Sequence, residues 1–429
     1  MELTQDNTTN KQENEVYEQR WAIVSLASIP LIMTLGNSML IPVLPMMESE
    51  MDISKFQSSL IITLYSVVAI FLIPIAGFLS DRFGRKVVIV PSLIISGLGG
   101  LLSGYAAWKF NDPYTWVLVG RILQGIGVSG TAPIVLPLVG DMFKRDQDIS
   151  ATLGIVETSN TLGKVLSPIL GSILAGIVWF IPFFSIPVFC LISAILVIFL
   201  VKRPPDDEKG PELKEFWKVT KKAFRIHGKW LVAIFIIGAI LMFVLFGLLF
   251  YLSSILEDDY NIDGIKKGFY LAGPLAMLCL TSFITGKLIK DNLNKMKWIT
   301  FIGILIAAVA IALVQFSEQF IYLLIVFLVC GVGIGACLPC LDSLITESIE
   351  KGVRGTITCI YSSARYIGVA AGPPIVALLM GKNLTWTVGL LGILAILAAV
   401  LAFRSIKPPS RGPTPPGTVF EKIAGDENK

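Results

Sequence analysis

Long apolar runs alternate with short polar segments along almost the whole chain. Each run holds about 20 residues, which is the length that an α-helix needs to cross the hydrocarbon core of a bilayer. The pattern predicts an all-α integral membrane protein with twelve transmembrane helices in two groups of six. The predicted spans are 21–46, 57–79, 87–107, 114–140, 150–176, 179–201, 230–255, 268–289, 298–316, 319–345, 355–380 and 385–403.

The composition agrees with a membrane protein, because 54% of the residues are hydrophobic and 15% are charged. About a quarter of a soluble protein is charged. The first 20 residues hold five acidic side chains and no apolar core, so they do not form a signal peptide. Cys337 and Cys340 form a C-x-x-C pair inside an apolar run, and the one histidine, His227, lies in a predicted loop. Without partner ligands for this pair, we expect no metal site.

Positive charges favour one side of the predicted membrane domain. Of the 35 Lys and Arg residues, 27 lie on the side that carries both termini and 5 lie on the other. Since basic loops stay in the cytoplasm, we expect a multi-pass plasma-membrane protein with both termini inside. The predicted parts are a cytoplasmic tail (1–20), a six-helix bundle (21–201), a cytoplasmic linker (202–229), a second bundle (230–403) and a tail (404–429).

The linker is basic and can form an amphipathic helix. Leu213, Phe216, Trp217, Thr220 and Phe224 can share one helical face, with Lys and Arg opposite. Such a helix would lie on the inner leaflet and attract anionic lipid; a solvated connection between the bundles is the alternative. Nucleic-acid binding is the weakest interpretation. The Pro-rich C-terminal tail is expected to be disordered.

The two groups of spans repeat each other. Gly125, Gly127, Pro133 and Asp141 match Gly331, Gly333, Pro339 and Glu347 at an offset of 206, and Gly163 and Pro168 match Gly368 and Pro373 at 205. Several matches in order indicate a duplicated six-helix unit. Repeats of this kind place a binding site at the midplane between the halves, and rocking of the halves exposes it to each side in turn. This favours a transporter over a receptor or an enzyme.

The segment GFLSDRFGRK joins spans 2 and 3 on the predicted cytoplasmic side. It resembles the loop signature of the major facilitator superfamily, and the matching positions are Gly77, Leu79, Asp81, Arg82, Gly84, Arg85 and Lys86. The resemblance implies a fold of two pseudo-symmetric six-helix bundles and a conformational latch. In that latch Asp81 faces the start of span 11, a helix N-terminus with a positive dipole end, and Arg85 reaches Asp141. The matching loop between spans 8 and 9 retains only Gly286, Asp291 and scattered bases, so a second latch is degenerate.

Span 4 carries Arg121 in the run GRILQGIG. An unpaired Arg there costs about 2.5–3.5 kcal/mol or more, so it should face protein or a water-filled cavity. With Gln124, Gly125 and Gly127 it resembles the span-4 motif of proton-coupled members of the superfamily, where this Arg affects proton transfer. An Arg that only cross-links helices is the alternative.

Span 5 resembles the antiporter pattern G-x8-G-x3-G-P-x2-G-G, which accompanies export rather than uptake. Gly154, Gly163, Pro168 and Gly171 keep the spacing, while Ser167 and Ser172 replace Gly, small for small. These residues, with Gly368 and Pro373 of span 11, are expected to bend and pack the helices. Gly36, Pro42 and Pro45 of span 1 have the spacing of the drug:proton antiporter branch.

The chain contains no phosphate-binding G-x-x-x-x-G-K-[ST] motif, so we expect a proton gradient, with no cofactor, to drive transport. Glu157 is the one carboxylate clearly within a span, which makes it the candidate proton carrier, with Arg121 as its predicted partner and Lys164 on the same helical face. Asp81 and Asp342, near cytoplasmic ends, are second choices. A buried ion-pair network that only fixes packing is the alternative.

Polar or aromatic residues within spans are candidates for the substrate cavity. Span 7 contributes Phe246, although lipid contact explains most of its aromatic side chains equally well. The other candidates are Asn37, Tyr65, Gln124, Asn160, Lys164, Tyr361 and Arg365.

The features together predict a monomeric, proton-coupled antiporter that exports lipophilic or amphiphilic small molecules, in the manner of multidrug efflux, from a bacterial inner membrane. Its expected partners are the small-molecule substrate, protons and membrane lipid. A dedicated exporter of an endogenous amphiphile, such as a siderophore, or a flippase for a lipid-linked glycan is the first alternative, because Lys164 and Arg365 suit an anionic ligand. An uptake symporter and a transporter-like sensor are the others.

Overall fold

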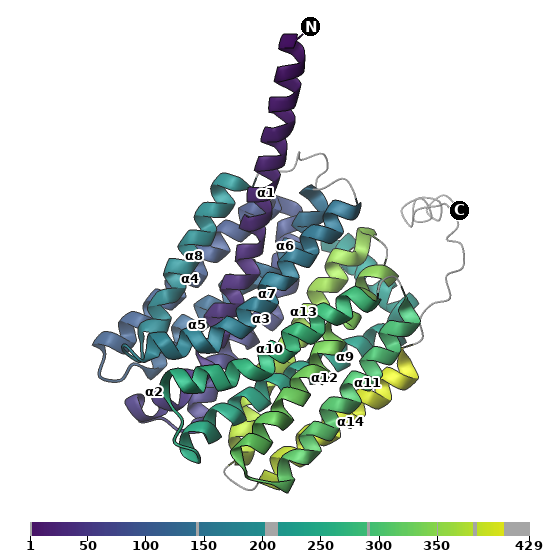
Figure 1. Ribbon diagram of the computed structural model, residues 1–429. Helices are drawn as coiled ribbons and strands as arrows, with labels where there is room; N and C mark the ends of the chain where they lie inside the picture. Colours follow the sequence, from purple (N-terminus) through teal and green to yellow (C-terminus); the bar gives the residue numbers. More distant parts are fainter. Residues whose placement is uncertain are drawn as a thin grey trace.

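The computed structural model describes residues 2–142, 146–201, 213–289, 292–349, 351–380 and 384–406, and within these ranges its regular elements are all helical (Figure 1). The first half contains α1 (Glu2–Ser38), α2 (Leu44–Met51), α3 (Lys55–Phe83), α4 (Arg85–Lys109), α5 (Tyr114–Ser129), α6 (Ala132–Met142), α7 (Asp146–Ala175) and α8 (Ile181–Leu200). The second contains α9 (Leu213–Asp258), α10 (Gly264–Ile289), α11 (Leu293–Leu313), α12 (Phe320–Ser348), α13 (Lys351–Met380) and α14 (Leu384–Ser405). Short 3-10 helices cover Ile41–Val43 and Val314–Phe316.

Eleven segments of the described chain are long and apolar enough to cross a membrane, and they coincide with eleven of the twelve predicted spans. The first joins α1 to α2, and the fourth joins α5 to α6. The predicted span 5 corresponds to α7, which is equally long but more polar, because it carries Glu157, Asn160 and Lys164. Since α7 packs between α1 and α10 inside the bundle, we count it as the twelfth. The predicted all-α, twelve-span fold is confirmed.

Glycine contacts repeat from one half to the other. A Cβ atom on Gly127 of α5, the counterpart of Gly333, would lie 2.6 Å from the carbonyl oxygen of Ser92 on α4. A Cβ atom on Gly333 of α12 would lie 2.5 Å from the carbonyl oxygen of Gly303 on α11. Both pairs of helices thus approach backbone to backbone, which only small residues allow. The repeat in the sequence therefore corresponds to a repeat in the way the helices pack.

The six residues predicted to bend and pack the helices lie on α7 and α13. Gly163 faces the backbone of Leu31 on α1, and its counterpart Gly368 faces the backbone of Ala239 on α9. Gly171 lies against the carbonyl of Met39, whereas Gly154 has no neighbour within 4 Å. Pro168 and Pro373 lie inside the two helices.

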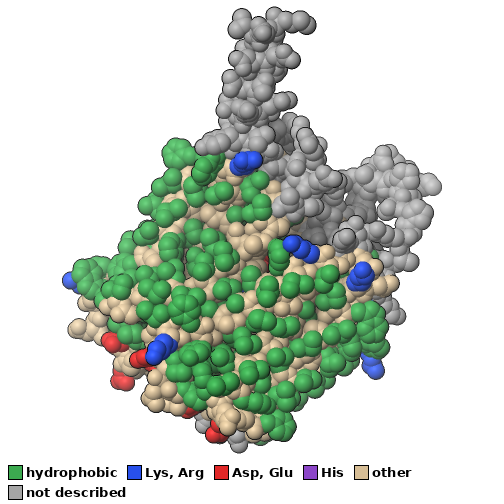
Figure 2. Space-filling model, in the orientation of Figure 1, with side chains coloured by type: hydrophobic (Ala, Val, Ile, Leu, Met, Phe, Trp, Pro, Cys, Tyr) green, Lys and Arg blue, Asp and Glu red, His purple; other side chains and the backbone are tan. Residues whose placement is uncertain are grey.

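The halves meet along two seams, α3 against α13 and α7 against α10. We call the end of the bundle that carries the start of α1 and the α3–α4 turn the inner end, and the opposite end the outer end. Hydrophobic side chains cover most of the face shown in Figure 2, and charged ones lie near its margins. Such an apolar belt matches a protein surrounded by lipid.

The basic linker is partly helical. Helix α9 begins at Leu213 and continues without a break into span 7, so residues 213–229 extend that helix and do not form a separate element. The apolar face predicted for this stretch, residues 202–212, Asp291 of the second loop and residues 407–429 of the predicted disordered tail lie outside the described part of the structure.

A charged cavity between the two halves

A cavity of about 170 Å³ lies between the halves. Helices α1, α3, α6 and α7 line it from the first half, and α9 and α13 line it from the second. The apolar part of its wall includes Met33, Met242, Phe246 and Val369. The charged part consists of Glu157, Lys164 and Arg365. A mostly apolar wall with a few charged groups is typical of a small-molecule site.

The two halves contribute to the cavity with equivalent helical positions. Three residues of α7 and three of α13 line the cavity, and each set is spaced i, i+3 and i+7 along its helix. The two sets match at a constant offset of 205: Glu157 with Ser362, Asn160 with Arg365, and Lys164 with Val369. The repeat places these positions equivalently in the two halves, but the side chains at matching positions differ. The two walls of the cavity therefore carry different charges.

Glu157 is exposed in the cavity and accepts a hydrogen bond from Asn160 Nδ2, 3.3 Å from Oε1. Asn160 in turn accepts a hydrogen bond from Thr34 Oγ1 at 2.6 Å. On the opposite wall, Arg365 Nη1 lies 3.3 Å from Asp342 Oδ1, and its guanidinium lies 5.6 Å from the ring of Tyr361. This pairing is not apparent from the sequence, in which Asp342 lies near a predicted cytoplasmic end.

The predicted pairing of Arg121 with Glu157 is wrong. Arg121 is fully buried and donates to Asn37 Oδ1 at 2.5 Å, to Gln124 Oε1 and to the carbonyl oxygen of Ile61 at 2.7 Å. Its guanidinium also lies 4.5 Å from the centre of the Tyr65 ring. Neutral acceptors of α1, α3 and α5 thus satisfy it inside the first half, behind the cavity wall.

Six of the eight predicted cavity residues line the cavity, and two do not. Asn37, Tyr65, Asn160, Lys164, Phe246 and Arg365 do. Gln124 is buried beside Arg121, and Tyr361 is buried with its ring 5.8 Å from that of Phe235. Met33 and Tyr366 also line the cavity and were not predicted to do so. Each lies four residues from another lining residue, Met33 from Asn37 and Tyr366 from Ser362, and this helical spacing is the feature of the sequence that could have identified them.

Contacts between the halves close the outer end of the cavity. Lys55 Nζ of α3 lies 2.5 Å from Asp258 Oδ2 of α9, and Ser253 Oγ donates to the carbonyl oxygen of Ile41 at 2.9 Å. Gly268 of α10 packs so closely on Pro168 that a Cβ would lie 2.6 Å from the carbonyl oxygen of Pro168. Because Glu157 remains exposed nearer the inner end, the structure is in a conformation whose cavity opens inward.

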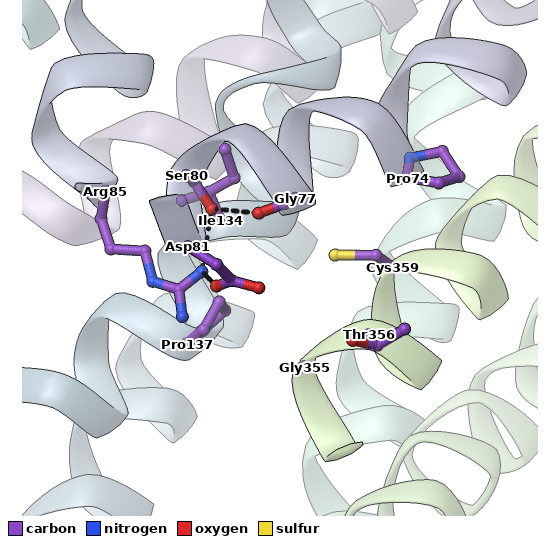
Figure 3. A pocket seen from close by; sticks show the side chains of 10 residues that line it. All are labelled: Pro74, Gly77, Ser80, Asp81, Arg85, Ile134, Pro137, Gly355, Thr356 and Cys359. Atoms are coloured by element: carbon purple, nitrogen blue, oxygen red, sulfur yellow. Dashed lines mark hydrogen bonds and ion pairs between the residues drawn. The ribbon is translucent and has the colours of Figure 1, made fainter. Parts of the chain in front are cut away.

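The predicted latch residues gather at the inner end. Arg85 forms an ion pair with Asp81, and its Nε lies 3.0 Å from Asp141 Oδ2. Asp81 and Arg85 line one side of a small pocket, and Gly355, Thr356 and Cys359 near the start of α13 line the other (Figure 3). A Cβ on Gly77 would lie 3.1 Å from Cys359 Sγ. The loop therefore meets α13 from the other half.

Other latch residues shape the turn itself. Gly84 has a φ of 96°, a conformation that suits glycine, and ends α3 so that α4 starts at once. Lys86 Nζ donates to the carbonyl oxygens of Ile198 at 2.7 Å and Val201 at 2.6 Å, at the end of α8. This places a cation on the negative end of the helix dipole. Arg82 lies 5.7 Å from the Phe83 ring.

Two six-helix halves around a cavity that is closed at one end define the class of secondary transporters that work by alternating access. The sequence model of the Major Facilitator Superfamily matches residues 26–373. This chain belongs to the major facilitator superfamily.

Curated relatives include exporters. The chain is 52% identical over 370 residues to "Bacillibactin exporter" of Bacillus subtilis, covering 86% of this chain and 92% of that protein. It is 24% identical to "Multidrug efflux protein YfmO" of the same organism, covering 87% and 90%. It is 26% identical to "Tetracycline resistance protein, class C" of Escherichia coli, covering 88% and 96%.

Solved structures show the same fold at low sequence identity. A bacterial homologue of the human lysosomal transporter Spinster, in an inward-facing and occupied conformation, matches with a TM-score of 0.74 at 15% identity, over 92% of this chain and 99% of that one. The human organic anion transporter MFSD10 matches with a TM-score of 0.71 at 16% identity, over 90% and 99%.

Proposed function

We propose that this protein exports bacillibactin, or an amphiphile of similar chemistry, from a bacterial cell in exchange for protons, with both termini in the cytoplasm. The observation that carries the proposal is the inward-open cavity with Glu157, Lys164 and Arg365 in its wall. The 52% identity to a bacillibactin exporter supports the substrate class. The excess of basic residues at the inner end supports the orientation.

Glu157 is the proposed proton carrier. Its carboxylate is exposed in the cavity and accepts hydrogen bonds from the neutral side chain of Asn160. A carboxyl that alternates between a wet cavity and a closed, drier one changes its proton affinity between the two states. Proton uptake at Glu157 would also change the charge that faces Lys164. The proton and the substrate are thereby coupled through one helix, α7.

Broad multidrug efflux is the second candidate function. Met33, Met242 and Phe246 give the cavity a deformable apolar wall, which suits varied lipophilic ligands. Relatives with multidrug and tetracycline names share 23–26% identity with this chain. The charged wall favours the dedicated exporter, because many drugs of such pumps are lipophilic cations.

The test is transport in liposomes that contain the purified full-length protein, under an imposed pH gradient, with bacillibactin and a panel of lipophilic cations and glycolipids. Glu157→Gln should abolish gradient-driven bacillibactin transport and preserve exchange of labelled for unlabelled substrate. Glu50→Gln, which removes an exposed carboxyl of α2, is the matched control and should transport normally.

Three outcomes would contradict the proposal. Uphill transport by Glu157→Gln would show that another group carries the proton. Movement of bacillibactin together with protons would identify an uptake symporter. Transport of glycolipid or cations in place of bacillibactin would favour a flippase or a multidrug pump.

A further inference from the structure

Lys164 differs from every other cation of the membrane interior that the structure describes. Its side chain lines the cavity although only 8% of the residue is exposed. Within the described residues its ammonium group makes no hydrogen bond or ion pair, while Arg365 is paired with Asp342 and Lys267 lies 2.6 Å from Glu257. An almost buried ammonium group without a direct partner is costly, so the site favours a ligand that supplies one.

The charge balance of the site also favours an anion. Around the cavity the described cations are Arg121, Lys164 and Arg365, and the described carboxylates are Glu157 and Asp342. The charged groups that act on Lys164 are Arg365, Glu157 and Asp342. Lys164 and Arg365 are matched in number by Glu157 and Asp342, and the buried Arg121 adds a third positive charge behind the wall, because guanidinium does not lose its proton in proteins.

The repeat marks Lys164 as a special feature of this cavity. Its counterpart at the same position of the second half is Val369, which lines the opposite wall. The same cavity wall also includes the apolar Met33, Met242 and Phe246. A ligand that satisfies both features has an acidic group for Lys164 and an aromatic or other apolar body for the rest.

We propose that Lys164 binds the acidic group of the exported substrate, so that the cavity selects anionic amphiphiles and rejects cationic ones. This inference rests on the proposed function, because it names the substrate class of the same cavity. Arg365 is the second cation of the site, and Asp342 competes with the ligand for it. Removing Asp342 should therefore strengthen anion binding, whereas removing the charge of Lys164 should weaken it.

The experiment measures equilibrium binding to the full-length protein in lipid nanodiscs, without any gradient. The probes are 2-naphthoate and 2-naphthylmethylammonium, which share one aromatic body and carry opposite charges. The wild type should bind the carboxylate more tightly. Lys164→Met should weaken carboxylate binding by about tenfold or more, the effect of losing one charge-assisted hydrogen bond, and Lys164→Arg should retain most of it.

Two further variants distinguish loss of the binding site from loss of the folded structure. Lys109→Met removes a lysine that lies over Trp108 at the outer end, and it should leave both probes unaffected. Asp342→Asn should raise the affinity for the carboxylate, which a misfolded protein cannot do.

Four results would overturn the proposal: no measurable binding of the carboxylate to the wild type, equal affinity of the wild type for both probes, unchanged carboxylate binding in Lys164→Met, or weaker carboxylate binding in Asp342→Asn. A lack of proton-driven export in liposomes would instead overturn the proposed function and leave this binding result intact.

Discussion

Gly154 and Gly171 belong to one sequence pattern, but their surroundings differ. A Cβ on Gly171 would overlap the carbonyl group of Met39, which is backbone and cannot move aside cheaply. Gly154 meets nothing within 4 Å. The pattern predicts both as packing residues, and only the three-dimensional contact of Gly171 with Met39, just after α1, distinguishes them. Sequence spacing identifies a small residue, but not the neighbour that requires it.

Gly171→Ala should therefore destabilise the protein, by about 1–3 kcal/mol, as expected for overpacking. Gly154→Ala is the matched control and should leave stability unchanged or improve it by up to about 1 kcal/mol, because Ala is the better helix former. Thermal unfolding of the purified variants in detergent measures both. Equal unfolding temperatures would show that the contact with Met39 relaxes freely.

At the scale of elements, the loop between α3 and α4 connects the two halves at the inner end. Arg85 holds Asp81 and Asp141 together within the first half, and the pocket beside them ends at Gly355, Thr356 and Cys359 of α13. A charge cluster that touches the opposite half changes its contacts when the halves rock. We therefore expect the loop to influence the rate of that motion.

Arg85→Gln should slow bacillibactin transport by about tenfold or more, the effect of about 1.4 kcal/mol on one step, without weakening its binding. Arg82→Gln removes the same charge from the same loop, where the guanidinium lies over Phe83, and should have a much smaller effect. Parallel measurements of transport rate and binding affinity distinguish the two. A loss of affinity in Arg85→Gln would mean that the loop shapes the cavity and does not only control its motion.

The contacts of the predicted latch residues follow from the sequence better than the charge pairs do, for a physical reason. Most of these residues lie within one short segment, 77–86, and the family resemblance supplies the pairing of Arg85 with Asp141. The partners of Arg121 and Arg365 depend on the rotation of whole helices about their axes, which hydropathy does not report. Asn37 and Asp342 were therefore recognisable as polar residues in spans, but not as the partners of Arg121 and Arg365.

At the scale of the whole molecule, the twelve spans and the duplication followed from run length and repeat spacing alone. The closed outer end did not, because it depends on contacts between the halves. Lys55 and Asp258 make one such contact, with about 40% of each side chain exposed. An exposed ion pair of this kind contributes little stability, so this contact adds little to the cost of opening the outer end.

Cross-linking should trap this conformation. A Lys55→Cys and Asp258→Cys double variant should lose transport on oxidation and regain it on reduction, because the bond would join the halves where they must separate. Glu257→Cys with Lys267→Cys is the matched control, since both residues belong to the second half. Liposome transport before and after reduction measures the effect. Undiminished transport by the oxidised first pair would show that the outer end does not open at this point.

The ammonium group of Lys164 has an electrical consequence. A carrier that binds an anion inside the cell and releases it outside moves negative charge out of a compartment that is already negative. The membrane potential then contributes about 2.3 kcal/mol for each charge at 100 mV, and it acts in the same direction on protons that enter. Voltage alone, set by potassium and valinomycin at equal pH on both sides, should therefore accelerate export.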